Sequence, residues 1–362
     1  MFNHKHYVPI LKGRQGEYGA LQTIPREVKS RVVPVVEIPP IPWDFAEEQP
    51  DKTVDQHLQG IGAKLERAWG VEAPMFVDLL WIAEDARMAD GVHPLTYVFG
   101  AARERGLQVI PVTGLVRGDE YQTACREIIS RDRRGVCLRL QREDFDESQD
   151  LVQQVSDLLN ALRVSPSDAD LILDLRALSG TEGGTLMAAV PALIRNVPRL
   201  NEWRAFALAA TAFPENLAGL PPSELSSLPR LEWVLWRNLV SRSRTLRLPA
   251  FSDYGIAHVQ PSEVDPRVMR PSASIRYTTD ETWLILKGRN LRDHGYPQFH
   301  DVSRFLVRRP EYNGPEFSWG DQYVDDCANE RVGTGNLTTW RKVGTSHHLA
   351  FVLSQLASVA WP

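Results

Sequence analysis

Eight short apolar runs alternate with longer segments of helical periodicity over roughly the first 255 residues. This alternation constrains the fold more than any other feature, because strands linked by crossover helices lie parallel in one sheet. The predicted strands are residues 7–11, 32–38, 74–80, 108–113, 135–140, 169–175, 204–210 and 246–251.

The helical segments between these runs are each long enough to carry the chain back across a strand. Examples are VDQHLQGIGAKLERAW, PLTYVFGAARERG, SQDLVQQVSDLLNALR and SELSSLPRLEWVLWRNLV, most with apolar residues three and four positions apart. A (β/α)8 barrel takes about 250 residues, whereas an open doubly wound sheet commonly has about five or six strands. We therefore predict an α/β fold with a (β/α)8 TIM-like barrel, and an open sheet is the alternative.

Prolines interrupt several of the predicted strands. Pro9, Pro34 and Pro111 each lie inside one, and proline lacks the amide hydrogen that a central strand normally donates. A barrel strand tolerates proline at its start or at a bulge, so the exact strand bounds are open. Pro25 is predicted to end or kink the first helix.

The composition changes after about residue 260. Residues 262–274 are rich in proline and serine and are typical of a linker. ASIRYTTDETWLILKG then predicts a hairpin that turns near Thr279 and Asp280, QFHDVSRFLVRR a helix, and FSWGDQY an ordered loop. We predict two parts: a barrel over residues 1–260, and an α+β extension over residues 261–362 that packs on it.

Ionisable side chains recur where the predicted strands end. Parallel barrel strands bring their carboxyl ends to one face, where barrel enzymes carry their catalytic groups. The residues at or just after these ends are Lys12, Glu37, Asp78, Arg139, Arg142, Asp174, Arg176, Asp253 and Tyr254.

Two interpretations of these charges remain open, because a buried charge without a partner is costly. In the first, Lys12, Arg139 and Arg176, with Tyr254, bind an anionic group. The carboxylates then serve as acid, base or metal ligand, and a divalent metal is a candidate cofactor; they are Glu37, Asp78, Asp174 and Asp253, with Glu37 preferred. In the second, the charges form an ion-pair network that closes the barrel.

Two adjacent histidines, His347 and His348, precede the apolar segment LAFVLSQLASVA. With Thr345 or Ser346 as the N-cap, the pair would open the last helix, where free amides favour an anion. Arg341 and Lys342 lie nearby. We therefore predict that one or both histidines contribute to a phosphate-binding corner.

Composition and charge exclude several classes of protein. A net charge of -5 argues against duplex nucleic acid as a partner, because proteins that bind it usually have a basic surface. The three cysteines match no metal or redox spacing, and no apolar run reaches membrane-spanning length. We expect a cytoplasmic protein that does not insert into membranes; its oligomeric state is open.

The segments YVPILKGRQGEYGAL and VVPVVEIPP, with WRKVGTSHHLAFVLSQLA near the end, resemble the beta-protein family of bacteria and their phages. The resemblance spans nearly the whole chain. It implies a barrel with a C-terminal extension, encoded among mobile elements and defence genes, and it draws attention to Lys12, Glu37, Trp340 and the His347–His348 pair. It implies no settled reaction.

Two functions follow from these observations. The first is a barrel that binds a phosphorylated or nucleotide-like anion at its C-terminal mouth, with hydrolysis as a candidate reaction. The second is a non-catalytic sensor or assembly subunit of an antiphage defence system, which would act on a partner protein. Unpaired carboxylates in a deep polar pocket favour an enzyme, whereas paired charges favour the sensor or subunit.

Overall fold

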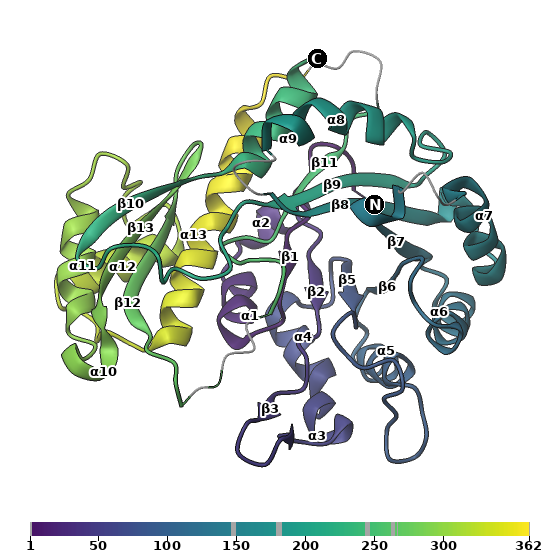
Figure 1. Cartoon of the computed structure of the whole chain (residues 1–362), viewed down its shortest axis with the longest axis horizontal. Helices are drawn as coiled ribbons and strands as arrows, with labels where there is room; N and C mark the ends of the chain where they lie inside the picture. The colour runs from purple at the N-terminus through teal and green to yellow at the C-terminus, as the bar shows by residue number, and fades with distance from the viewer. Residues whose placement is uncertain are drawn as a thin grey trace.

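The protein is described by a computed structural model that covers residues 2–145, 150–178, 183–242, 247–261, 265 and 267–361. Its centre is a parallel eight-stranded sheet (Figure 1), in the order β1-β2-β5-β6-β7-β8-β9-β11. The strands are β1 Ile10–Leu11, β2 Val35–Glu37, β5 Met75–Asp78, β6 Val109–Thr113, β7 Val136–Gln141, β8 Ala169–Ala177, β9 Ala205–Thr211 and β11 Ala250–Asp253. Each corresponds to one of the predicted strands; the first residue of the last prediction, Leu246, lies outside the described residues.

The sheet closes where its first and last strands meet. Tyr7 forms parallel bridges to both Val32 and Phe251, and the Val8 amide donates to the Phe251 carbonyl oxygen at 2.9 Å. The predicted (β/α)8 barrel is therefore confirmed, and the open doubly wound alternative is wrong.

The prolines are accommodated because their carbonyl groups still accept ladder hydrogen bonds. The Pro9 oxygen accepts from the Val35 amide at 2.8 Å, and the Pro34 oxygen accepts from the Phe76 amide at 2.9 Å. The missing amide hydrogens shorten the regular ladder, so β1 has two residues and β2 begins just after Pro34.

Helices surround the barrel (Figure 1). As predicted, Pro25 separates two of them, since it lies between the end of α1 and the start of α2. In the described part of the chain, no helix is long and apolar enough to cross a membrane. The helices of the barrel are α1 Gln15–Gln22, α2 Arg26–Lys29, α3 Val54–Leu58, α4 Ile61–Trp69, α5 Pro94–Arg103, α6 Asp119–Asp132, α7 Leu151–Leu162, α8 Gly183–Arg195 and α9 Leu231–Arg242, and a short hairpin, β3 Trp43–Asp44 with β4 Gln49–Pro50, precedes α3.

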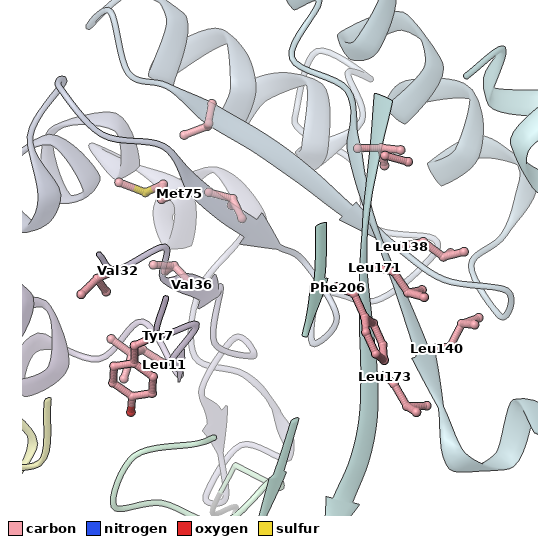
Figure 2. Close-up of a cluster of buried hydrophobic side chains, with 14 of the residues drawn as sticks. Tyr7, Leu11, Val32, Val36, Met75, Leu138, Leu140, Leu171, Leu173 and Phe206 are labelled. Carbon is pink, nitrogen blue, oxygen red and sulfur yellow. The ribbon is translucent and has the colours of Figure 1, made fainter. Parts of the chain in front are cut away.

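Alternate side chains of the barrel strands enter two different cores. One core lies between the strands and the surrounding helices, and Figure 2 shows part of it, including Leu138 and Leu140 from β7 and Leu171 and Leu173 from β8. The other core fills the barrel interior. Fully burying one such side chain contributes about 1.5–3 kcal/mol, so both cores hold the strand positions firmly.

The C-terminal extension is built on a small antiparallel sheet with the order β10-β13-β12. β12 Ser272–Thr278 and β13 Thr282–Asn290 form the predicted hairpin, and α11 Gln298–Val307 is the predicted helix. α10 Leu291–His294, α12 Trp319–Ala328 and α13 Leu337–Ser358 complete it. The predicted extension packed on the barrel is confirmed: α13 contacts both α1 of the barrel and β12.

Two predictions for individual segments are wrong, and a third has the wrong C-terminal bound. Residues 224–229 were expected to open a helix, but they form strand β10, Glu224–Pro229, which pairs with β13. FSWGDQY enters helix α12 because Ser318 caps its N-terminus. The proline- and serine-rich linker ends where β12 begins, at Ser272, and residues 262–264 and 266 lie outside the described residues. A division of the chain near residue 260 remains a proposal. β10 precedes that position in the sequence, yet it belongs to the smaller sheet.

Candidate functional site

A layer of charged side chains crosses the barrel interior at the carboxyl ends of its strands. Side chains two positions apart in a strand point to the same face, so each charge sits directly above an apolar residue of the inner core. Ile10, Val35, Phe76, Cys137 and Ile172 are followed two positions later by Lys12, Glu37, Asp78, Arg139 and Asp174. These five, with Tyr254, form the ionic layer, and each is at most 5% exposed.

Arg139 joins the three carboxylates of the ionic layer. Its Nη1 donates to Glu37 Oε1 at 2.8 Å and to Asp78 Oδ2 at 2.9 Å. Its Nε and Nη2 donate to Asp174 Oδ2 at 3.0 and 2.7 Å. One guanidinium from β7 therefore links strands β2, β5 and β8 across the barrel, as the fork of arginine donors allows.

Glu37 accepts hydrogen bonds from three different side chains, one of which is Arg139. Lys12 Nζ donates to its Oε2 at 2.7 Å, and the indole Nε1 of Trp81 donates to the same oxygen at 3.0 Å. Burial alone raises the pKa of Glu37, but Lys12 and Arg139 outweigh it and lower the pKa to about 2. Lys12 also donates to the Val259 carbonyl. Glu37 is therefore fixed as a paired anion at physiological pH.

The other two carboxylates are also partnered. Arg117, from the loop after β6, donates to Asp78 Oδ1 at 2.6 Å, and the Tyr254 hydroxyl donates to Asp174 Oδ2 at 2.6 Å. Counting Arg117, three cations face three carboxylates. The sequence analysis did not identify Arg117. It lies four residues after Thr113, the end of β6, and a charge just after a strand end is the feature that identified the other residues of the layer.

Arg176 lies at the rim of this layer. Its backbone has φ 59°, which is uncommon for a residue other than glycine, and its amide donates to Asp174 Oδ1 at 2.9 Å. Its guanidinium Nη1 donates to Gln141 Oε1 at 3.3 Å. The Asp174 carboxylate therefore holds the Arg176 backbone in place.

Asp253 does not join the ionic layer, because it faces the opposite side of β11. Ala250 and Tyr254 point inward, so Asp253 points out toward the helices. There the Tyr7 hydroxyl donates to its Oδ1 at 2.6 Å, and His348 Nε2 lies 2.9 Å from its Oδ2. Burial alone raises the pKa of Asp253, but His348 and Tyr7 reverse the shift and lower it. The prediction that places Asp253 at the mouth is wrong.

The predicted phosphate-binding corner at the start of the last helix is also wrong. α13 begins at Leu337, where Asn336 caps it by accepting from the Thr339 amide at 3.0 Å. The histidine pair therefore lies in the middle of the helix, where amides bond to carbonyl groups within the helix. In the sequence, Asn336 is the N-cap residue that could have identified the true start of α13.

Both histidines are buried, and each is paired with a carboxylate. His347 Nδ1 lies 2.9 Å from Asp321 Oδ2, and its Nε2 lies 2.8 Å from the Thr278 carbonyl oxygen. His348 Nδ1 lies 2.8 Å from the Thr278 hydroxyl. Burial lowers the pKa of His348 although Asp253 opposes the shift. The two histidines thus tie α13 to β11 and β12 rather than to a shared ligand.

No metal centre is evident in the parts of the chain that the structure covers. Within them, no group of three or more histidine, cysteine, aspartate or glutamate side chains is placed to hold an ion. The cysteines Cys125, Cys137 and Cys327 are buried free thiols.

Fold and site together define a (β/α)8 barrel protein with an ionic layer at its C-terminal mouth. The profile of the Beta protein family matches residues 7–354, and the chain belongs to this family. No curated protein matches it. Among solved structures, an alanine racemase of Clostridium difficile 630 in complex with cycloserine is similar, with 12% identity and a TM-score of 0.31. The likeness covers 76% of this chain and 59% of the racemase, so the chain spans less than two thirds of that protein.

Proposed function

We propose that the protein binds an anionic ligand, phosphorylated or nucleotide-like, at the C-terminal mouth of its barrel, without turning it over. The proposal rests chiefly on Arg176. It is partly buried at the rim, its backbone is held by Asp174, and the described partner of its guanidinium is the neutral amide of Gln141. Arginine forks bind phosphate and carboxylate groups in two-point contacts.

Two further rim groups support an anionic ligand. Arg117 is partly buried beside the layer. His258 accepts from the Gln260 amide through Nδ1, so the proton of its neutral ring is on Nε2 and is available as a donor. Burial lowers the pKa of His258, and the charges of Lys12 and Arg176 lower it further against Glu215. The rim is therefore cationic around a neutral imidazole donor.

The pairing of the carboxylates supports binding without turnover. A general base is most effective when its pKa lies near the working pH. Glu37, with a pKa of about 2, is a weak base whose oxygens already accept from Lys12, Arg139 and Trp81. Asp78 and Asp174 are similarly engaged. Carboxylates that are all paired favour a sensor or assembly subunit over an enzyme. From the sequence resemblance we propose that it acts in an antiphage defence system.

Ligand-induced stabilisation of the full-length protein tests the proposal. Nucleotides and sugar phosphates are screened for a rise in Tm, and the Kd of any ligand found is measured by calorimetry. We expect Arg176→Gln to weaken binding about tenfold or more, since a charge-assisted hydrogen bond contributes about 1.5–3 kcal/mol. The exposed, ion-paired Arg199→Gln should bind as the wild type does.

Two outcomes would overturn the proposal. One is unchanged affinity in Arg176→Gln, which would place the ligand elsewhere. The other is steady turnover of the bound ligand that Glu37→Gln abolishes while the fold is retained, which would make the protein an enzyme. For the defence role, cells that carry the wild-type gene should resist phage plaquing, and cells that carry Arg176→Gln should not.

A further inference from the structure

A second group of cations lies away from the ionic layer, at the seam between the barrel and the C-terminal extension. Arg276, from β12, donates through Nη1 to the Ile256 carbonyl oxygen at 2.7 Å. Arg341, from α13, donates through Nη1 to the same oxygen at 3.3 Å. Ile256 follows the last barrel strand, so two guanidinium groups of the extension meet at one backbone oxygen atom of the barrel part.

These two arginines lack a counter-ion. Among the described residues, neither forms an ion pair with a carboxylate. The carboxylate that raises the pKa of both arginines is Glu17, and at Arg341 the charge of Arg14 acts in the opposite direction. Burial and the charge of Arg341 lower the pKa of Arg276 well below the usual arginine value. Because arginine keeps its proton in proteins, this shift reflects a cation without a partner rather than a neutral side chain.

The pair is also fixed in place and is only partly buried. Arg276 lies over the Phe213 ring, with 4.8 Å between guanidinium and ring centroid. The side chain of Arg341 packs against Gly16, where an added Cβ would come within 2.8 Å of it. Both arginines are partly exposed, and their remaining nitrogens are not among the buried unpartnered atoms. Preformed donors therefore remain unused at a surface that solutes can reach.

We propose that Arg276 and Arg341, with Arg14 beside them, form a binding site for a phosphate group at the seam between barrel and extension. Each guanidinium has five donors in a planar fork, and a tetrahedral dianion bound between two forks would accept from both and cancel their repulsion. A ligand at this position contacts the barrel loop, β12 and α13 together. The site shares no residue with the rim around Arg176.

Thermal unfolding of the full-length protein in inorganic phosphate tests this site, with sodium chloride at matched ionic strength as the reference. We expect phosphate to raise the Tm of the wild type above that in chloride. Arg276→Gln and Arg341→Gln should each reduce the phosphate affinity by tenfold or more. The exposed Arg199→Gln is the control and should respond as the wild type does. The rim variant Arg176→Gln is measured in parallel to separate binding at the seam from binding at the mouth. Pyrophosphate and ADP, tested in parallel, show whether free phosphate or a larger phosphoryl ligand binds more tightly.

The melting temperature without phosphate shows whether a variant has lost phosphate binding or has simply folded poorly. Without phosphate, Arg341→Gln should melt at the same temperature as the wild type or above it, because removing one of two neighbouring cations relieves repulsion. The proposal is overturned if phosphate does not stabilise the wild type more than chloride, or if both seam variants keep the full response. A response lost only in Arg176→Gln would assign phosphate to the mouth and overturn the seam site alone.

Discussion

At the scale of single residues, Glu232 is a buried carboxyl group outside the ionic layer with a strongly raised pKa. It is 1% exposed in the first turn of α9, where its Oε2 accepts from the Ala212 amide at 3.1 Å. Its Oε1 has no hydrogen-bond partner among the described residues and lies 3.7 Å from Nε of the equally buried Arg230. Burial raises the pKa of Glu232 from 4.5 to about 8, although Arg230 lowers it. The group is therefore mostly protonated in the folded protein at neutral pH.

This shift predicts a falling stability between pH 5 and pH 8. In that range the folded state holds a proton that the unfolded state releases, so the free energy of unfolding decreases as pH rises. The full contribution is about 1.4 kcal/mol per pH unit and levels off above pH 8. Glu232→Gln cannot titrate, so its stability relative to the wild type should increase with pH. Urea unfolding at pH 5, 6.5 and 8 measures the difference.

The exposed Glu202, paired with Arg199, supplies the matched control. Its pKa is lowered by the Arg199 hydrogen bond, so it titrates below this range. Glu202→Gln should therefore keep a constant offset from the wild type. Parallel curves for Glu232→Gln and the wild type between pH 5 and pH 8 would show that Glu232 is ionised in the folded protein.

At the scale of elements, α13 is the element that joins the two parts of the chain, and glycine permits its closest contacts. An added Cβ at Gly320 in α12 would lie 2.2 Å from the Val343 carbonyl oxygen of α13. At Gly344 in α13 it would lie 2.9 Å from the Arg276 carbonyl oxygen of β12. Because these neighbours are backbone atoms, they cannot rotate away, and the helix itself would have to move.

Gly320→Ala should therefore destabilise the protein by about 1–3 kcal/mol, the usual cost of overpacking a well-filled contact. Chemical denaturation of the purified variant measures this loss. Gly333→Ala is the control, since no atom lies within 4 Å of a Cβ there and its φ is not positive. Equal stability of the two variants would mean that α12 and α13 separate at little cost.

The elements also show what the sequence could and could not predict. The alternation of apolar runs and helical segments predicted all eight barrel strands, because a strand buried on both faces must be apolar over most of its length. The start of α13 was misjudged, since Asn336 precedes a first turn with two threonines, which are weak helix formers. Asp253 was misplaced because a strand end one residue longer or shorter reverses the face to which a side chain points.

At the scale of the whole molecule, the barrel and the extension share structural elements. β10 precedes α9 in the barrel half of the sequence, yet it pairs with β13 of the extension. Such long-range pairing leaves no local signal, so the sequence indicated a helix there. α13 also covers Tyr7 and Asp253 on the outer face of the barrel, where His348 bonds to Asp253 and Asp253 accepts from the Tyr7 hydroxyl. The barrel thus depends on residues beyond 260 for two of its buried polar groups.

These shared elements predict that residues 1–260 alone do not form a stable barrel. Without the extension, β10 loses its partner strand, and Asp253 loses His348 while Tyr7 is uncovered. Leaving a buried polar or charged group without one of its hydrogen-bond partners costs about 1–3 kcal/mol or more, a sizeable part of the 5–15 kcal/mol by which typical domains are stable. We expect residues 1–260 to lack a cooperative thermal transition by circular dichroism, and co-expression of residues 261–362 as a separate chain to restore it. If the fragment alone melted cooperatively near the temperature of the full-length protein, the barrel would be an independent unit, and α13 would be an attachment rather than part of its core.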